Sequence, residues 1–175
     1  MNVMVGLAKI SQEEVVLSLK KEEMTLLLQW IEIRNEKLYR IGWSYLQNQL
    51  DIEDALHNAI LITYEKIYTL KTDHYFETWF IRIFLNECKK ILREKKRSRV
   101  MEKIDSDNEL PEREKVSNLE LSDVMEKLDN DTRELITLKY ISGYTHKEIG
   151  QIVKMQENTV KTKIHRGLKA IRKLF

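Results

Sequence analysis

The sequence predicts an all-α protein made of two small helical domains joined by a flexible linker, the second of which contains a helix-turn-helix. Glycine is scarce, with 5 among 175 residues, and proline occurs once, at Pro111. No stretch alternates polar and apolar residues for long enough to predict a strand. Apolar residues recur instead three and four positions apart along most of the chain, which is the spacing of amphipathic helices.

Charge is segregated along the chain. The formal net charge is only +2, although 33% of the residues are charged. Residues 89–99 are basic, residues 102–134 are acidic, and the chain is basic again from residue 154 onward. Because nearby charges dominate the local potential, these segments predict partners better than the total charge does.

The single cysteine, Cys88, excludes an internal disulfide and a zinc site with several cysteines. Its apolar neighbours predict a buried thiol, which fits a reducing compartment. No apolar run is long enough to span a bilayer, and the first residues lack the order of a secretory signal. We therefore expect a cytoplasmic protein with no membrane insertion.

Capping residues and apolar spacing predict the first helices. Ser11 and Glu14 form a capping box that begins a helical stretch. Residues 24–47 keep helical spacing, with a break near the middle. The two tryptophans of this segment, Trp30 and Trp43, are expected in the core, because aromatic residues at helical spacing are mostly structural.

The next helix is expected to begin with Asp51 as its N-cap and to run to about Tyr68. Its inner face should comprise Leu56, Ile60, Tyr64 and Ile67. Asp54 and His57 stay near the first turn on the outside, where an acidic residue suits the helix dipole. A metal site of His57 with Glu53 and Asp54 is disfavoured, since such groups on an exposed turn are usually solvated. No metal and no cofactor are predicted.

A short polar connection follows, and Asp73 is expected to cap an unusually aromatic helix. Its wide apolar stripe consists of Phe76, Trp79, Phe80, Ile83 and Phe84. Its other faces carry Arg82, Asn86, Lys89, Lys90, Arg93, Lys96 and Arg97. Cations beside an aromatic-rich helix fit single-stranded nucleic acid, but the aromatics fit a hydrophobic core equally well, so both interpretations stay open.

Residues 97–116 lack a sustained apolar period and contain the only proline, which predicts the linker. After it, Ser117 with Glu120 should cap a short amphipathic helix over residues 121–128. Asp131 with Glu134 is expected to cap the next helix. That helix should end at Gly143, a residue type favoured just beyond a helix C-terminus.

The end of the chain predicts a helix-turn-helix. Thr145 with Glu148 forms a capping box for a short helix, and a second helix begins near Gln156. An apolar stripe of the second helix faces the core: Val160, Ile164, Leu168 and Ile171. Its other face carries Lys161, Thr162, His165, Arg166, Lys169, Arg172 and Lys173. Cations bind phosphates, and short polar side chains reach base edges, so this face suits a DNA major groove. The alternative is a solvated basic helix that ends an ordinary bundle.

Four segments in a fixed order resemble bacterial RNA polymerase sigma factors of the extracytoplasmic-function group: residues 36–41 (EKLYRI), 51–56 (DIEDAL), 76–86 (FETWFIRIFLN) and 159–166 (TVKTKIHR). The resemblance implies a domain over residues 1–96 that binds core RNA polymerase and opens the minus-10 region. It implies a linker over residues 97–116. It also implies a domain over residues 117–175 that reads the minus-35 element, and it implies an anti-sigma protein as a partner.

The same resemblance implies the site residues. Polymerase contacts fall on Asp51, Asp54, His57 and Ile60. Minus-10 contacts fall near residues 69–76 and on Arg82, Asn86, Lys89, Lys90 and Arg93. Minus-35 contacts fall on Asn158, Thr159, Lys161, Thr162, His165 and Arg166. The chain departs from the family pattern at His57 and Asn58, where Gln-Glu is common, and at Lys154 and Gln156, which replace a turn glycine and a serine-type cap.

Two other classes compete with this interpretation. Residues 159–166 also resemble the recognition helix of response-regulator activators, but such proteins need a receiver or ligand domain, and residues 1–96 supply only helices. A helical-bundle enzyme is the second alternative. The carboxylates and four histidines form no spaced set with a nucleophile or metal, so catalysis is not predicted.

Overall fold

The computed structural model describes residues 10–105 and 128–173, and for residues 99–105 it describes the backbone alone. The N-terminal helices are α1 (Gln12–Lys20), α2 (Thr25–Ile33), α3 (Asn35–Leu46), α4 (Gln49–Lys66) and α5 (Phe76–Asp105). The C-terminal helices are α7 (Asn130–Ile136), α8 (His146–Val153) and α9 (Glu157–Arg172). Short turns lie at Ile67–Thr69, Asp73–Tyr75 and Thr137–Ile141, the last of them π-helical. Among these described helices, none combines the length and apolar character that crossing a bilayer requires.

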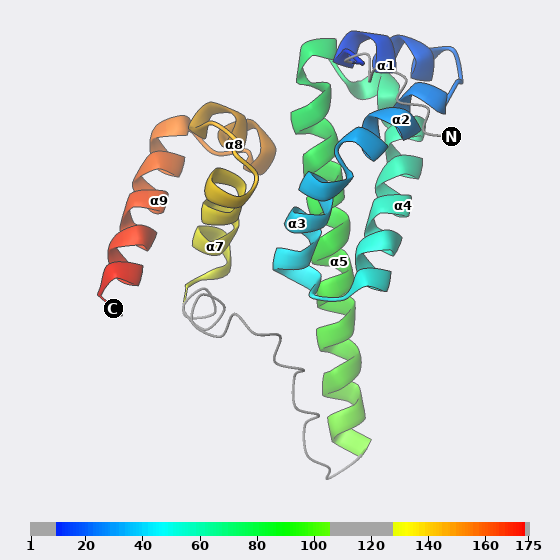
Figure 1. Ribbon diagram of the computed structural model, residues 1–175. Helices are drawn as coiled ribbons and strands as arrows, with labels where there is room; N and C mark the ends of the chain where they lie inside the picture. Colours follow the sequence, from blue (N-terminus) through cyan, green and yellow to red (C-terminus); the bar gives the residue numbers. More distant parts are fainter. Residues whose placement is uncertain (1–9, 106–127, 174–175) are drawn as a thin grey trace, which may run out of the picture.

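Helix α5 is the axis of the molecule. It packs against α4, α3 and α1, and on another side against α8. Figure 1 shows α3 and α4 flanking α5, while α7, α8 and α9 form a second group beside them. The described residues form helices and turns without a strand, so the predicted all-α fold is confirmed.

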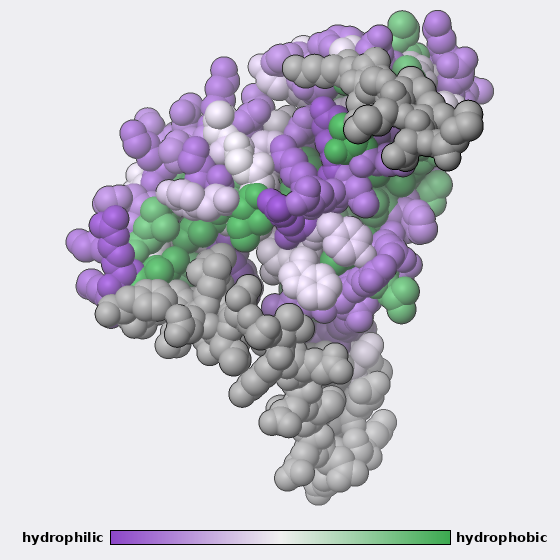
Figure 2. All heavy atoms as spheres, viewed as in Figure 1, coloured by the Kyte–Doolittle hydropathy of each residue, from purple (hydrophilic) through white to green (hydrophobic). Residues whose placement is uncertain are grey.

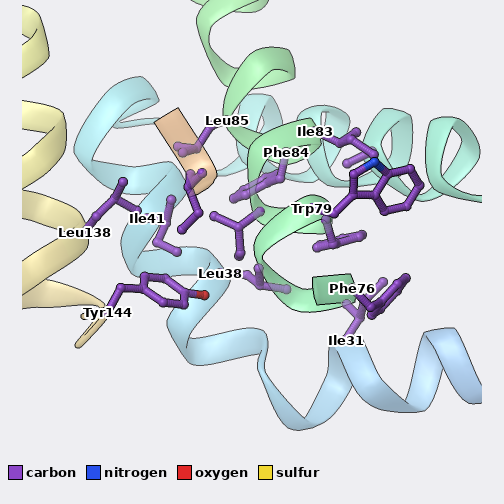
Figure 3. Packing of buried hydrophobic residues seen from close by; sticks show 14 of the residues in the cluster. Ile31, Leu38, Ile41, Phe76, Trp79, Ile83, Phe84, Leu85, Leu138 and Tyr144 are labelled. Atoms are coloured by element: carbon purple, nitrogen blue, oxygen red, sulfur yellow. The ribbon is translucent and has the colours of Figure 1, made fainter. Parts of the chain in front are cut away.

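The aromatic stripe of α5 forms the centre of the N-terminal core. Phe76, Phe80 and Phe84 are fully buried. Trp30 contacts the first two edge-on, with ring centroids 5.2 Å and 5.4 Å apart, and Figure 3 shows how the stripe packs between the surrounding helices. Of the two interpretations of these rings, the structure therefore supports the hydrophobic core. The prediction for Trp43 was wrong: it is 45% exposed, because Leu38, Ile41 and Gly42 form the buried face of α3.

Helix α4 begins earlier than predicted. Its N-cap is Asn48, whose side-chain oxygen accepts a hydrogen bond from the Asp51 amide at 3.1 Å. Asp51 is therefore the third residue of the helix and not its cap. Of the predicted inner face only Ile67 is fully buried; the other buried positions are Ile52, Ala55, Ala59 and Thr63. Small alanines on this face let α4 approach α5 closely, which leaves Leu56, Ile60 and Tyr64 half-buried at its edges.

Asp73 was also wrongly expected to cap α5. It lies within the turn that precedes the helix and forms an ion pair with Lys20 at 3.3 Å. The side chain of Gln12 performs the capping instead, because its Oε1 accepts a hydrogen bond from the Glu77 amide at 2.8 Å. This partner comes from α1, so local sequence around Asp73 could not reveal it.

The cap of α7 lies two residues before the predicted one. Asp129, not Asp131, accepts the hydrogen bond from the Thr132 amide at 2.9 Å. Asp131 instead forms an ion pair with Lys163 of α9 at 3.2 Å. Aspartate is a good capping residue at either position, so local sequence alone did not distinguish Asp129 from Asp131.

Helix α5 continues to Asp105, so residues 97–105, which we placed in the linker, are helical. Figure 1 shows this end of α5 extending beyond the other helices. The segment lacks an apolar period, which argued against a helix, yet Lys, Arg, Glu and Met are good helix formers. The expected cap at Ser117 and nearly all of the helix expected over residues 121–128 lie outside the described residues.

Candidate nucleic-acid interface

The first helix of the helix-turn-helix begins as predicted. The Thr145 hydroxyl accepts from the Glu148 amide at 3.2 Å, and the Glu148 carboxylate accepts from the Thr145 amide at 2.8 Å. Just before it, Gly143 has a φ of 75°, a conformation that favours glycine. These two features orient α8 relative to the preceding turn.

The turn between α8 and α9 is tight. A Cβ at Gly150 would lie 2.6 Å from the carbonyl oxygen of Met155, so only glycine fits there. Lys154 ends α8 in the left-handed conformation, with a φ of 58°. Gln156 is the N-cap of α9 but makes no side-chain capping bond. The two departures from the family pattern in this turn, Lys154 and Gln156, thus fall at positions with a defined backbone role.

Helix α9 has one buried face and one basic exposed face. Val160 and Ile164 are buried, and Gly167 lies so close to α7 that a Cβ there would be 2.3 Å from Thr132. The opposite face carries the exposed residues Asn158, Thr159, Lys161, Thr162, His165, Arg166 and Lys169. Figure 2 shows hydrophilic side chains gathered over α8 and α9. The structure therefore brings together all the residues that the sequence assigned to the minus-35 element.

The basic side of α5 is partly covered. Asn86, Lys90 and Arg93 are exposed, whereas Arg82 and Lys89 are half-buried. The Lys89 ammonium lies 2.8 Å from the Glu134 carboxylate of α7. The five residues assigned to the minus-10 strand thus lie along one helix, but α7 and α8 contact part of that surface.

A cavity of about 530 Å³ lies beside the turn that joins α4 to α5. It is lined by Thr69, Leu70, Lys71, Thr72, Tyr75, Thr78, Trp79, Arg82 and Gln151. Its walls combine hydroxyls, aromatic rings and one guanidinium. This combination suits an unstacked base, because rings and guanidinium planes stack on bases while hydroxyls bond to their edges.

Helix α4 presents a mixed exposed face. Asp54 and His57 are exposed as predicted, but Ile60 is half-buried, and Asp51 is only 14% exposed because it pairs with Lys95. Sequence reasoning missed two apolar neighbours, Leu50 at 70% and Leu61 at 57% exposure. Leu50, Asp54, His57 and Leu61 recur four, three and four positions apart, and that spacing was the available signal. Exposed leucines beside an acidic residue are suited to a protein partner.

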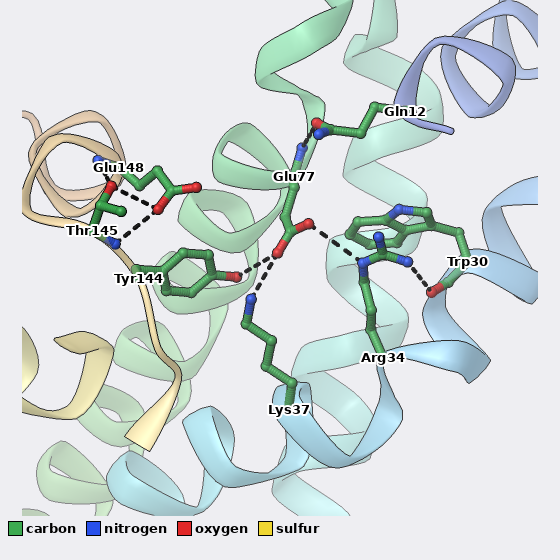
Figure 4. Close-up of polar contacts among 8 residues, drawn as sticks. All are labelled: Gln12, Trp30, Arg34, Lys37, Glu77, Tyr144, Thr145 and Glu148. Carbon is green, nitrogen blue, oxygen red and sulfur yellow. Dashed lines mark hydrogen bonds and ion pairs between the residues drawn. The ribbon is translucent and has the colours of Figure 1, made fainter. Parts of the chain in front are cut away.

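A cluster around Glu77 joins the two groups of helices. Its carboxylate lies 2.8 Å from the Lys37 ammonium and 3.4 Å from Arg34 Nε, and it accepts a hydrogen bond from the Tyr144 hydroxyl at 3.0 Å. Figure 4 shows these contacts between α5, the junction of α2 with α3, α3 itself and the segment before α8. Burial raises the pKa of Glu77, but the Lys37, Arg34 and Tyr144 contacts together leave that pKa below its ordinary value. Sequence reasoning did not single out this cluster, because its members are far apart in the chain.

Cys88 is fully buried, and burial raises the pKa of its thiol to about 12. A thiol with such a pKa is almost entirely protonated at neutral pH, so it is not a nucleophile. The prediction of a buried structural thiol is confirmed.

A helix-turn-helix with a basic recognition face, set beside a helical bundle with a basic axis helix, defines a two-part protein that binds nucleic acid. Comparison with known families agrees. Residues 32–98 match sigma-70 region 2, and residues 118–171 match sigma-70 region 4.

Curated relatives narrow the family. The chain is 32% identical over 171 residues to the ECF RNA polymerase sigma factor SigW of Bacillus subtilis, covering 88% of this chain and 91% of SigW. It is 29% identical over 137 residues to the ECF RNA polymerase sigma-E factor of Escherichia coli, covering 69% and 72% of the two chains. The chain therefore belongs to the extracytoplasmic-function group of RNA polymerase sigma factors, transcription initiation factors that direct the polymerase to promoters.

Solved structures share the fold. CnrH, in a complex with the cytosolic domain of CnrY, matches with a TM-score of 0.72 at 17% identity, covering 94% of this chain and 96% of CnrH. The sigma factor RpoE of Bartonella quintana, in a complex with the anti-sigma factor NepR, matches with a TM-score of 0.59 at 18% identity, covering 93% and 94%. At these identities the comparison supports the arrangement of helices.

Proposed function

We propose that this chain divides promoter recognition among three surfaces. In this proposal α9 reads the minus-35 element as duplex, α5 with the cavity beside it holds the separated minus-10 strand, and the exposed face of α4 binds core RNA polymerase. Residues 1–96 and 117–175 are the two functional domains. The observation that carries the proposal is the continuous basic and polar face of α9, which projects away from a core that is complete beneath it.

The residues of α9 divide into two roles. Arg166, Thr162 and Asn158 carry donors and acceptors that suit base edges, and the cations of the same face suit phosphates. The Thr162 hydroxyl already donates to the Asn158 carbonyl at 2.8 Å, so its oxygen remains available as an acceptor. We assign base reading to Arg166 and phosphate binding to Lys169.

Helix α5 supplies cations in line with the cavity. Arg82 lines the cavity itself, while Asn86, Lys89, Lys90 and Arg93 continue along the helix. A strand whose phosphates follow these cations would place an unstacked base at the cavity. This arrangement combines the two features of single-strand binding, an electrostatic track and a pocket for a base.

Core polymerase is assigned to the face of α4 formed by Leu50, Asp54, His57 and Leu61. Partly apolar patches with a few charges are typical of protein interfaces. We further propose an anti-sigma protein as a regulatory partner, since the similar RpoE is described in a complex with one. Such a factor acts in the cytoplasm, where the polymerase is, and has no catalytic role of its own.

The primary experiment mixes the purified chain with core RNA polymerase. We expect the two to co-migrate and to start transcripts at defined sites in a library of genomic fragments. Arg166→Ala should reduce the free energy of binding to the cognate minus-35 element by about 1–3 kcal/mol and relax base specificity at one position of that element. Lys169→Ala is the control for charge. It should weaken binding to all DNA sequences alike and lower by about one the slope of the logarithm of the binding constant against the logarithm of salt concentration. Unchanged promoter choice in Arg166→Ala would disprove the assigned reading face.

The polymerase surface has a separate test. Asp54→Lys should reduce co-migration with core polymerase, while circular dichroism stays unchanged because exposed substitutions cost about 0.5 kcal/mol or less. Glu13→Lys, at an exposed position in the first turn of α1, is the matched control and should bind polymerase normally. Equal losses in both variants would show a general charge effect and not a docking surface.

A further inference from the structure

The cavity beside the turn that joins α4 to α5 has a wall whose position depends on packing behind it. Most of the residues that line the cavity belong to this turn, residues 67–75, which we call the α4–α5 turn. Its backbone hydrogen bonds, such as that from the Leu70 amide to the Ile67 carbonyl at 3.1 Å, close only a single turn of chain. Such bonds fix local conformation, but they do not fix where the turn lies relative to α5. The position of the cavity wall is therefore set by contacts with other elements.

Helix α1 supplies such contacts. It packs against both short turns of this connection, and Figure 1 shows it across the end of the molecule at which α4 meets α5. Tyr68 donates its hydroxyl proton to the Lys20 carbonyl oxygen at 3.0 Å, and the Lys20 ammonium pairs with Asp73 at 3.3 Å. Gln12 Oε1 accepts from the Glu77 amide at 2.8 Å, as Figure 4 shows. Helix α1 thus holds the beginning and the middle of the α4–α5 turn and the first turn of α5 that follows.

Helix α1 is itself well anchored. Val15, Val16 and Leu19 are buried in the N-terminal core. The Ser18 hydroxyl donates to the Glu23 carbonyl oxygen at 2.8 Å, which fixes the turn that leads into α2. Every residue of α1 is described, and none of them is among the residues that line the cavity. Helix α1 therefore acts on the shape of the cavity and not on a bound base.

We propose that α1 sets the base specificity of the cavity by positioning its wall, with Gln12 and Tyr68 as the positioning residues. This inference rests on the proposed role of the cavity at the minus-10 strand. A pocket distinguishes bases when its hydrogen-bonding groups are held to within about 0.5 Å of the required geometry. A looser wall lets a wrong base form partial bonds, so discrimination falls more than overall binding does. The Lys20–Asp73 pair contributes less, because its side chains are 36% and 39% exposed.

Two substitutions each remove one contact of α1. Gln12→Ala removes the acceptor for the Glu77 amide, whereas Gln12→Glu keeps an acceptor oxygen and should preserve the contact. Gln29→Ala, at an exposed position on α2, is the matched control. Tyr68→Phe removes the hydroxyl and keeps the ring. Its control is Tyr140→Phe, at a tyrosine of the C-terminal group that is 59% exposed.

Hydrogen exchange in the free chain measures whether α1 holds the α4–α5 turn. Mass spectrometry follows peptic fragments that cover residues 67–77. We expect Gln12→Ala and Tyr68→Phe each to speed exchange there by about two- to tenfold, the factor that corresponds to one hydrogen bond. Gln12→Glu and both control variants should exchange like the wild-type chain. Unchanged exchange in Gln12→Ala and Tyr68→Phe would overturn the proposal.

Base specificity is measured with each chain bound to core polymerase. Fluorescence anisotropy follows labelled single-stranded oligonucleotides that carry the minus-10 sequence of a promoter found in the transcription experiment, with each position changed in turn to the other three bases. Tyr75→Ala and Arg82→Ala, which alter the cavity wall, identify the position that the cavity reads. At that position Gln12→Ala and Tyr68→Phe should lower the ratio of cognate to non-cognate affinity by about two- to tenfold. Gln12→Glu should keep the wild-type ratio.

A purely structural role of α1 gives a different result. It would lower the yield of the polymerase complex but leave the affinity ratio unchanged, so an unchanged ratio would overturn the proposal even where exchange had risen. An equal loss of specificity in Gln29→Ala would also overturn it, because the effect would then not depend on contact with the α4–α5 turn.

The inference and the proposed function fail in distinguishable ways. If Tyr75→Ala or Arg82→Ala relaxes one position while Gln12→Ala and Tyr68→Phe relax none, the role of α1 fails and the proposed function stands. If neither Tyr75→Ala nor Arg82→Ala relaxes any position, the cavity does not read a base. The assignment of the cavity to the minus-10 strand then fails, and the role of α1 fails with it.

Discussion

The two groups of helices bury their apolar residues in different ways. The N-terminal group has a core to which every one of its helices contributes, with Trp30, Phe76, Phe80 and Phe84 at its centre. The described C-terminal group has a smaller core around Leu135, Ile149, Val160 and Ile164, without a buried ring among them. Two further buried residues of this group, Leu138 and Tyr144, are directed at α3 and α5 instead.

This difference affects how much each group depends on its neighbour for stability. A domain of only a few dozen residues buries a small share of its surface, so each contact makes a large fractional contribution. The C-terminal group gains additional burial by packing on its neighbour, and that same contact covers part of the basic face of α5. The N-terminal group has the larger share of the buried residues, so it depends less on this contact. Substitutions can therefore test the two cores separately.

The largest expected effect lies in the N-terminal core. Trp30→Ala should destabilise the chain by about 3–5 kcal/mol, because it leaves a large cavity beside Phe76 and Phe80. Trp43→Ala is a matched control in the next helix, and at 45% exposure it should cost about 1 kcal/mol or less. Urea unfolding followed by circular dichroism measures both. Similar losses in the two variants would contradict the division between buried and exposed tryptophans.

A smaller effect is expected where α9 crosses α7. Gly167→Ala places a methyl group 2.3 Å from Thr132 and 3.0 Å from Ile136, and such overpacking costs about 1–3 kcal/mol. Ala170→Ser in the same helix is exposed and should change the free energy of unfolding by about 0.5 kcal/mol or less. Comparison of the two variants by thermal unfolding tests whether the small core depends on this close approach. A neutral Gly167→Ala would show that α7 and α9 can separate without cost.

Local sequence predicted much of the fold, and the failures share one cause. The capping boxes at Ser11 and Thr145 and the aromatic stripe of α5 were predicted correctly, because the interacting residues lie within one or two turns of each other. The predictions for Asp73 and Trp43 were wrong. The cap of α5 comes from Gln12 of another helix, and the rotation of α3 about its axis leaves Trp43 exposed. Periodicity gives the apolar face of a helix, but it does not say which edge of that face a neighbour will cover.

In the candidate site too, features within one helix were predictable and features that join several helices were not. The basic face of α9 lies on a single helix, so its spacing alone predicted which residues would be exposed together. The cluster around Glu77 draws on α3, α5, the junction of α2 with α3 and the segment before α8, and no local pattern connects these elements. The exposed leucines of α4 were visible in the sequence as a helical spacing with Asp54. They lie outside the buried stripe of α4, so the apolar periodicity that predicts a core face does not include them.

The smallest expected effects concern the turn that joins α8 to α9. Lys154 adopts a left-handed conformation, which costs an L-residue about 1–2 kcal/mol. Glycine avoids this cost but loses more backbone entropy on folding, so the substitution should regain only part of that free energy. Gln156 leaves the N-cap of α9 without a side-chain bond, and serine there can accept from an amide of the first turn. Lys154→Gly and Gln156→Ser should therefore each raise the free energy of unfolding by about 0.5–1 kcal/mol.

The measurement of these two variants also bears on the comparison between the cores. If the C-terminal group unfolds separately, the gain should appear only in its own transition, whereas a single cooperative transition should shift as a whole. Lys147→Gly, within α8, is the matched control for the glycine and should destabilise by about 1 kcal/mol, because there the backbone is helical and exposed. A loss of stability in Lys154→Gly would mean that the lysine side chain contributes more to the turn than its backbone conformation costs. In that event the departure from glycine at this position would be stabilising.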